Sequence, residues 1–186
     1  VVPVIKYYKQ MGFTLEEMGG FIEGKNPNIY RAIKNSFLAK IEELDREQAA
    51  LIRKRESVKD WYNMVVEAQM VIDSHIQEVS VRYVEPDDYI YQEQLFENDI
   101  KASIINIEWT NYLEENNNEI TGPVMLNFSS YKDRMENKEQ KVRIFQKPLL
   151  PTGNIPIMQL GGCMMATCYH VGPHETLGEA YTKISK

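Results

Sequence analysis

Cysteine and histidine side chains near the end of the sequence are the first groups that could do chemistry. Cys168, His170 and His174 carry the thiol and imidazole groups that bind zinc. Cys168 and His170 would share one face of a strand, but Gly172 and Pro173 place His174 beyond a turn, and no fourth ligand is suggested. We interpret the histidines as separate surface or hydrogen-bonded residues, and we predict neither a metal site nor a cofactor.

Catalytic groups do not stand out either. Ser129–Ser130 lacks the flanking glycines of a nucleophile elbow. The pair Gly161–Gly162 precedes an expected strand rather than a helix, which argues against a phosphate-binding loop. Carboxylates are plentiful, but no pair can be distinguished from a solvated acidic surface. The sequence therefore predicts a protein that is not an enzyme.

Aromatic side chains are abundant after residue 80, and they favour binding rather than catalysis. Tyr89 and Tyr91 would share one face of an alternating segment, with Glu93 on the same side. An aromatic cleft with a carboxylate at its edge binds flat apolar or cationic molecules. The alternative for any single ring is a place in the hydrophobic core. The predicted ligand-binding residues are Tyr89, Tyr91, Glu93, Trp109, Phe128, Phe145 and Tyr169.

The elements that must position these residues follow an α+β pattern, because after His75 the apolar period changes from helical spacing to alternation. This order predicts an antiparallel sheet with helices. Strands are expected at Val79–Val84, Tyr89–Phe96, Val124–Phe128, Val142–Lys147 and Cys163–Val171, and helices at Asp99–Glu115 and after Gly172–Pro173.

A long helix is predicted ahead of the strands, starting at Asn26–Pro27 and running without proline or glycine to about His75. Its length of about 75 Å is too great for a domain this small to cover its apolar stripe. We therefore predict a coiled coil between two copies, with an intramolecular helical hairpin as the alternative. The stripe comprises Phe37, Ile41, Leu44, Gln48, Leu51, Arg55, Val58, Tyr62, Val65, Gln69, Ile72 and Ile76.

Two short helices are predicted before the long one. Gly12 would end the first helix in a left-handed conformation. Thr14 and Glu17 form a capping box at the start of the second, and Phe13 and Met18 fit a hydrophobic staple around it. The chain opens without Met and stops inside a helix-like stretch, so we expect further sequence on both sides.

Composition restricts the class of protein. The chain has 186 residues, of which 43% are hydrophobic and 26% charged, enough for one or two small folded units. A net charge of -6 argues against a histone-like nucleic-acid binder, although the first sixty residues are mildly basic. Two cysteines, no long apolar run and no signal segment predict a cytoplasmic protein without a membrane partner.

The first part of the chain resembles the MerR family of bacterial transcription regulators. That family has a typical run of residue types that leads from its winged-helix head into a long dimerisation helix. The residues that match this run are Ile5, Lys9, Gly12, Phe13, Thr14, Leu15, Glu16, Glu17 and Met18. The helix-turn-helix and most of the wing, which come earlier in such proteins, are absent from this sequence.

The remainder resembles the GyrI-like, or AraC-type, effector-binding domain. The matching features are Gly122–Pro123, Tyr131 with Asp133, Phe145 with Pro148, Tyr169–Leu177 and Ala180–Tyr181. His174 stands where the family usually has an aromatic residue, which alters what the pocket accepts. The resemblance implies a partial DNA-binding head over 1–26, a coiled-coil dimerisation helix over 27–76 and an effector-binding domain over 78–186.

The resemblance also implies a function. Such regulators bind promoter DNA as homodimers, and ligand binding lets them distort the DNA so that RNA polymerase can engage. The drug-sensing branch is implied, because the metal and redox sensors carry cysteines near the end of the helix and residues 60–80 have none. Lys6 and Lys9 are expected to contact DNA phosphates, with a solvated helix face as the alternative. The acidic ligand-binding residue of related sensors would lie beyond Lys186.

Two other functions remain open at this point. A GyrI-like module without DNA activity would sequester small molecules or inhibit a partner protein, but it would have no use for the Ile5–Met18 run. A hydrolase is the third possibility, since some GyrI-like proteins are thought to act on small molecules. It would need a catalytic carboxylate, such as Glu93 or Glu175, which the spacing does not single out.

Overall fold

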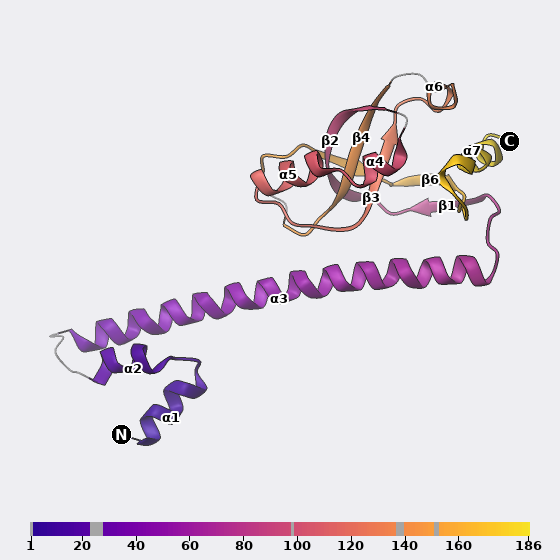
Figure 1. Ribbon diagram of the computed structural model, residues 1–186. Helices are drawn as coiled ribbons and strands as arrows, with labels where there is room; N and C mark the ends of the chain where they lie inside the picture. The colour runs from indigo at the N-terminus through magenta and orange to yellow at the C-terminus, as the bar shows by residue number, and fades with distance from the viewer. Residues whose placement is uncertain (1, 23–27, 98, 137–139, 151–152) are drawn as a thin grey trace. The chain divides into compact units, whose positions relative to one another are not determined.

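The computed structural model describes residues 2–22, 28–97, 99–136, 140–150 and 153–186 (Figure 1). The chain divides into two compact units, residues 1–52 and 53–186, here called the N-terminal and C-terminal units. The fold class is α+β, as predicted: a long helix is followed by antiparallel strands with helices.

The N-terminal unit contains two short helices, α1 (Val2–Gln10) and α2 (Leu15–Ile22), and the first part of α3 (Ile29–Asp73). Gly12 has φ +85 and ends α1, as the sequence predicts. The predicted capping box is confirmed: the Glu17 amide donates to Thr14 Oγ1 at 3.3 Å, and the Thr14 amide donates to Glu17 Oε2 at 2.6 Å. Local sequence thus fixes the turn between the two short helices.

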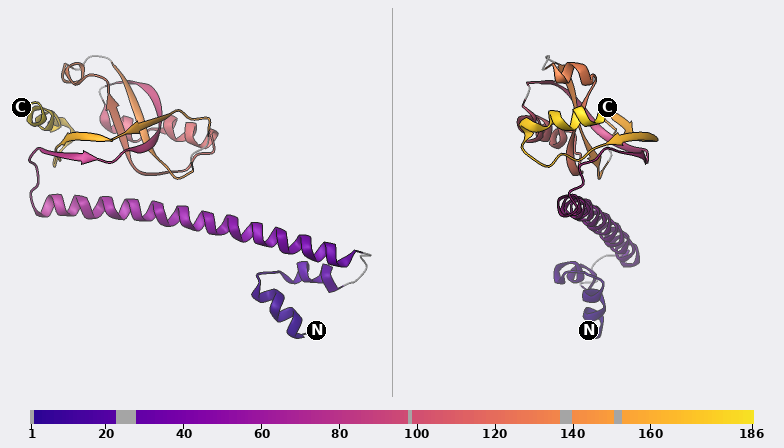
Figure 2. Two further views of the ribbon diagram at one scale, coloured as in Figure 1. Left: turned by 180° about the vertical axis from the view of Figure 1, so that it is seen from behind. Right: turned by 90° about the vertical axis from the view of Figure 1, so that its right-hand side faces the viewer.

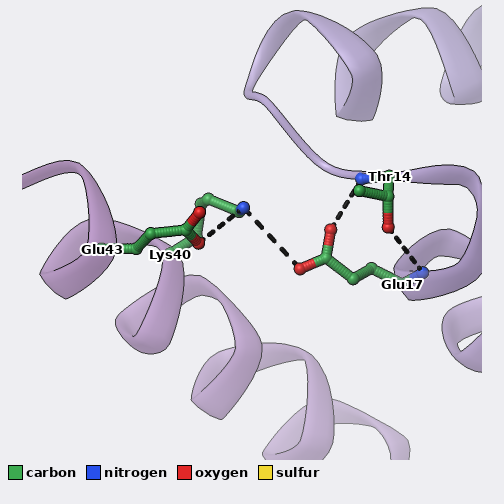
Figure 3. A network of polar contacts seen from close by, with 4 residues as sticks. All are labelled: Thr14, Glu17, Lys40 and Glu43. Atoms are coloured by element: carbon green, nitrogen blue, oxygen red, sulfur yellow. Dashed lines mark hydrogen bonds and ion pairs between the residues drawn. The ribbon is translucent and has the colours of Figure 1, made fainter. Parts of the chain in front are cut away.

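A polar network joins α2 to α3 within this unit (Figure 3). Lys40 Nζ lies 2.7 Å from Glu43 Oε2 and 3.7 Å from Glu17 Oε1. The hydrogen bond to Glu43 raises the pKa of Lys40, and the hydrogen bond from the Thr14 amide lowers the pKa of Glu17. Lys40 also lies over the ring of Phe13, 5.5 Å from its centroid.

Helix α3 is a single 45-residue helix, which corresponds to a length of about 68 Å. Its predicted start at Asn26–Pro27 lies outside the described residues. Several apolar residues of the predicted stripe are exposed to solvent in the single chain: Ile41, Leu44, Leu51, Val58, Tyr62, Val65 and Ile72. Within the described residues, none of the helices has the length and apolar character needed to span a membrane.

The C-terminal unit contains two sheets, where the sequence predicts one. Strands β1 (Ser80–Val84) and β6 (Cys163–Thr167) form a two-stranded sheet, and β2 (Asp87–Phe96) pairs with β5 (Ile157–Leu160) in a second sheet. The β1–β6 and β2–β5 pairs keep one continuous register across the interruption. The two sheets are therefore segments of one long antiparallel ribbon.

The interruption in the ribbon has a local cause. Pro86 has no amide hydrogen to donate to the ladder. Opposite it, Gly161 and Gly162 have φ +103 and +71, and the Gly162 amide donates to the Val84 carbonyl at 2.7 Å. A Cβ on Gly161 would lie 2.2 Å from the carbonyl oxygen of Glu85, so only glycine permits this close approach.

The second sheet has the order β3-β4-β2-β5, with β3 (Ile120–Phe128) and β4 (Gln140–Pro148) completing it. Helix α5 (Ile107–Glu115) covers one face of this sheet (Figures 1 and 2). The resulting hydrophobic core comprises Ile90, Phe96, Trp109, Leu113, Val142, Ile144 and Ile155. The alternation along β2 therefore puts one set of side chains into the core and the other set on the opposite face.

Several predicted elements need correction. The single helix predicted over Asp99–Glu115 is two helices, α4 (Ile100–Ile104) and α5, because Asn106 is extended and caps α5 by accepting from the Trp109 amide at 2.8 Å. The strand predicted over Cys163–Val171 ends at Thr167. Elements that the sequence did not indicate are α6 (Tyr131–Met135), β5 and the 3₁₀ turn η1 (His174–Thr176), which precedes the last helix, α7 (Gly178–Ile184).

Replacing Gly161 with alanine tests the account of the ribbon. We expect Gly161→Ala to lower the free energy of unfolding by about 2 kcal/mol or more, because both its φ and the Glu85 carbonyl oppose a side chain. Gly153→Ala is the control, since a Cβ there meets nothing within 4 Å, and its effect should stay within about 0.5 kcal/mol. Urea denaturation measures both, and equal stability of the two variants would contradict the explanation.

Candidate functional site

Aromatic and charged side chains gather on the face of the four-stranded sheet opposite α5. Tyr89, Tyr91 and Glu93 alternate along β2 on this face, as predicted from their spacing. On β4, Phe145 is the cross-strand partner of Tyr91, and Arg143 is the partner of Glu93. Paired residues of antiparallel strands project to the same side of a sheet. These five residues are called the aromatic face below.

The side chains of the aromatic face contact one another closely. The rings of Tyr89 and Phe145 meet edge to face, with centroids 5.4 Å apart and planes at 85°. Arg143 Cζ lies 5.3 Å from the centroid of Tyr91, and its Nε lies 3.0 Å from Glu93 Oε1. Phe145 is buried, whereas the side chains of Arg143 and Glu93 retain 46% and 41% of their exposure. The face thus has a buried aromatic base and a charged edge that solvent reaches.

A second ion pair lies at the other end of the aromatic face. Lys147 Nζ is 3.0 Å from Asp87 Oδ2, and this hydrogen bond raises the pKa of Lys147. Partial burial raises the pKa of Tyr89, and the nearby Asp87 carboxylate adds to the effect. Both phenol and ammonium therefore keep their protons at neutral pH.

The structure places Trp109 and Phe128 on the other face of the sheet. Trp109 is 2% exposed, and its indole Nε1 donates to Gln146 Oε1 at 2.8 Å, while Gln146 Nε2 donates to the Gly122 carbonyl at 3.0 Å. The ring of Phe128 packs edge to face on Phe96, at 4.9 Å between centroids. The sheet separates these two residues from the aromatic face. They therefore belong to the hydrophobic core, which is the alternative given above for any single ring.

Tyr169 lies apart from both faces, in a cavity of about 280 Å³ next to the C-terminal end of α3. Its hydroxyl donates a hydrogen bond to Glu67, which raises the pKa of Tyr169. Val71, on the next turn of the helix, is buried. The cavity is lined by Met64, Glu67, Ala68, Val71, Ile72, Tyr169, His170 and Val171.

Arg143 and Glu67, which contact the predicted ligand-binding residues, were not predicted from the sequence. Arg143 is fifty residues from Glu93, and nothing local indicates that their strands pair in this register. Glu67 looks like any polar residue of a long helix. Alternation within β2 was enough to group Tyr89, Tyr91 and Glu93, but the basic residue that contacts them comes from a distant strand.

The cysteine and histidine residues make local contacts. Because β6 ends at Thr167, Cys168 and His170 do not share a strand face as predicted. Cys168 Sγ donates to the Gln77 carbonyl at 3.3 Å, and His170 Nε2 lies 3.0 Å from the Pro173 carbonyl oxygen. Among the residues with described positions, no group of three or more histidine, cysteine or acidic side chains could hold a metal ion. Cys163 and Cys168 are both free thiols.

The two lysines predicted to contact DNA lie on α1. Lys6 and Lys9 are both exposed, and Lys9 is in the last turn of the helix. A helix face that contacts phosphates is as exposed as one that is only solvated. The DNA-contacting role of Lys6 and Lys9 therefore stays a prediction.

Comparison with known proteins identifies the C-terminal part of the chain. Residues 77–186 match a family described as the GyrI-like small molecule binding domain. No curated protein matches the chain. Among solved structures, it is similar to a chain of the "Cryo-EM structure of EcmrR-DNA complex in EcmrR-RPo", with 16% sequence identity and a TM-score of 0.45 over 99% of this chain and 67% of that one.

The hydrogen bond between Tyr169 and Glu67 can be tested by pH. Because the raised pKa favours the protonated phenol in the folded state, its contribution to stability is present below the ordinary pKa of 10.0 and is lost as pH rises through the raised value. In an alkaline absorbance titration, Tyr169→Phe should remove part of the late tyrosine ionisation, and Glu67→Gln should shift that part to lower pH.

The control for this titration is Tyr30→Phe, which removes an exposed tyrosine from α3, the helix that carries Glu67. It should leave the late ionisation in place. A late phase that persists unchanged in Tyr169→Phe would show that Glu67 does not hold this phenol in solution.

Proposed function

The chain belongs to the family of GyrI-like small-molecule-binding domains through residues 77–186, and from this premise we propose that it is a dimeric transcription regulator that responds to a small hydrophobic or cationic ligand. The match covers more than half of the chain and confirms the GyrI-like part of the predicted resemblance. The family is defined by binding, in agreement with the prediction of a protein that is not an enzyme.

The observation that carries the proposal is the apolar stripe of α3. Its apolar side chains from Ile41 to Ile72 recur at three- and four-residue spacing and are exposed, for example Leu51 at 65% and Val58 at 69%. Phe37 packs instead on Tyr8 and Phe13, and Ile76 lies beyond the end of α3. Isolated apolar residues on a surface are ordinary, but a continuous stripe over many helical turns is typical of a helix that pairs with another. A second copy of this chain supplies an identical stripe, which supports a homodimer with a two-fold coiled coil.

The N-terminal unit supports promoter DNA as a partner. It has the capped α1–α2 pair of the MerR-like run, and Lys6 and Lys9 are exposed on α1. In a regulator of this kind, a dimer holds two such units on one DNA site, and ligand binding changes the shape of the DNA. RNA polymerase is then an indirect partner, which responds to the altered DNA, and the site of action is the cytoplasm.

The aromatic face supports a flat, largely apolar ligand. The partly exposed rings of Tyr89 and Tyr91 provide a hydrophobic surface next to the buried ring of Phe145, and polar atoms at its edges can orient a bound molecule. Burial of such a ligand and its stacking on the rings would provide most of the affinity.

A binding module without DNA activity is the second candidate. The observation that favours it is the extent of the family match, which starts at residue 77 and leaves α1, α2 and the whole of α3 outside. Such a module would sequester small molecules, and its long helix would serve dimerisation alone.

The full-length protein distinguishes the two candidates. It is titrated against genomic DNA fragments, with and without a panel of cationic and neutral aromatic dyes. We expect selective retention of one promoter fragment and a dye-dependent change in the retained complex. Dye binding without retention of any DNA fragment would favour the sequestering module.

The coiled coil gives a separate prediction. Leu51→Asp should weaken dimerisation about 100-fold or more, because each dimer would lose two buried leucines and gain two buried charges. Ala49→Asp is the matched control: it adds the same charge to the same helix, but about 200° around the axis from Leu51. Sedimentation equilibrium measures both variants, and equal weakening would contradict the proposed stripe.

A further inference from the structure

The position in which a cationic ligand would bind the aromatic face is already filled by a side chain of the protein. A cation is attracted by a ring within about 6 Å of its centroid and by a nearby carboxylate. Arg143 meets both conditions, since its Cζ lies 5.3 Å from the Tyr91 centroid and its Nε lies 3.0 Å from Glu93 Oε1. The guanidinium therefore occupies the cation-binding position that Tyr91 and Glu93 create.

Two ion pairs carry most of the charge around the aromatic face, and Asp60 of α3 adds a further carboxylate near Lys147. Glu93 is paired with Arg143, and Asp87 is paired with Lys147 at 3.0 Å at the other end of the same face. An incoming cation thus meets two carboxylates that already have partners. To reach Glu93 it must break the contacts of Arg143, whereas an uncharged aromatic molecule can stack on the partly exposed ring of Tyr89 without breaking them.

We propose that Arg143 is a specificity-determining residue, which competes with cationic ligands for Tyr91 and Glu93 and so selects flat, uncharged aromatic molecules. This inference rests on the proposed function, because it assumes that the aromatic face binds the ligand. It narrows the ligand class expected from the sequence, which comprises both flat apolar and cationic molecules.

Because Arg143 and Glu93 are exposed, the competition between Arg143 and a cationic ligand can be measured. The side chains of Arg143 and Glu93 are 46% and 41% exposed, whereas Phe145 on the same face is buried and contacts the ring of Tyr89. Removing the guanidinium therefore empties the cation position without disturbing the aromatic base. Because exposed cation–π contacts and ion pairs are each weak, the effect on cation affinity should be about tenfold rather than larger.

The test compares two probes of nearly the same shape with the full-length protein. N-methylacridinium is a flat permanent cation, and acridine held in its neutral form is its uncharged counterpart. We expect the native protein to bind acridine more tightly. Arg143→Ala should increase the affinity for N-methylacridinium about tenfold, leave the affinity for acridine within about twofold, and thereby reverse the preference.

The matched control is Lys141→Ala. Lys141 is exposed on the same strand and face, two residues from Arg143, and its cross-strand partner is Leu95 rather than an acid. Lys141→Ala changes the net charge by the same amount as Arg143→Ala, but it should leave the affinities for acridine and N-methylacridinium unchanged. Adding Glu93→Gln or Tyr91→Ala to Arg143→Ala should abolish the gain for the cation, which locates the effect on the aromatic face.

Each other outcome overturns the inference, and the outcomes separate it from the proposed function. If the native protein binds the probes and Arg143→Ala behaves like Lys141→Ala, Arg143 does not set the selectivity, while ligand binding stands. If neither probe binds to any variant, the ligand class proposed above fails together with this inference. If the cation gain survives Tyr91→Ala, the cation binds elsewhere and the competition assigned to Arg143 is wrong.

Discussion

Strand β2 is paired along both edges, with β4 on one side and β5 on the other, and the C-terminal unit is arranged around this pairing. Because side chains alternate along a strand, the pairing gives the two faces of the sheet separate tasks. Ile90 and Phe96 point into the core under α5, and both are almost completely buried. Tyr89 and Tyr91, one residue away, are excluded from that core and form the aromatic face.

The same pairing also determines the electrostatics of the aromatic face. A register that places Arg143 opposite Glu93 neutralises the carboxylate, and it puts the guanidinium beside Tyr91 at the same time. A shift by one residue would send Arg143 to the core side, where a charged group would be costly. Val142, Ile144 and Gln146 alternate along β4 and are buried in the core. Their burial therefore stabilises the register that pairs Arg143 with Glu93.

Several features of the fold followed from local sequence. The Thr14–Glu17 capping box, the glycine that ends α1 and the length of α3 all depend on residues within a few positions of each other. Alternation also located β1, β2 and β4. The division of the expected helix at Asn106 was missed, because an asparagine within an apolar helical pattern is usually tolerated, and only its capping of Trp109 shows that it starts a new helix.

The sequence alone determined which residues could form a ligand surface, since aromatic type and alternation are properties of the chain itself. Only the tertiary structure decided which of them meet. It separated Trp109 and Phe128 from Tyr91, placed Tyr169 beside Glu67, and set Arg143 against Glu93. These contacts join segments far apart in the chain, and their geometry depends on strand register and core packing, which no local pattern contains.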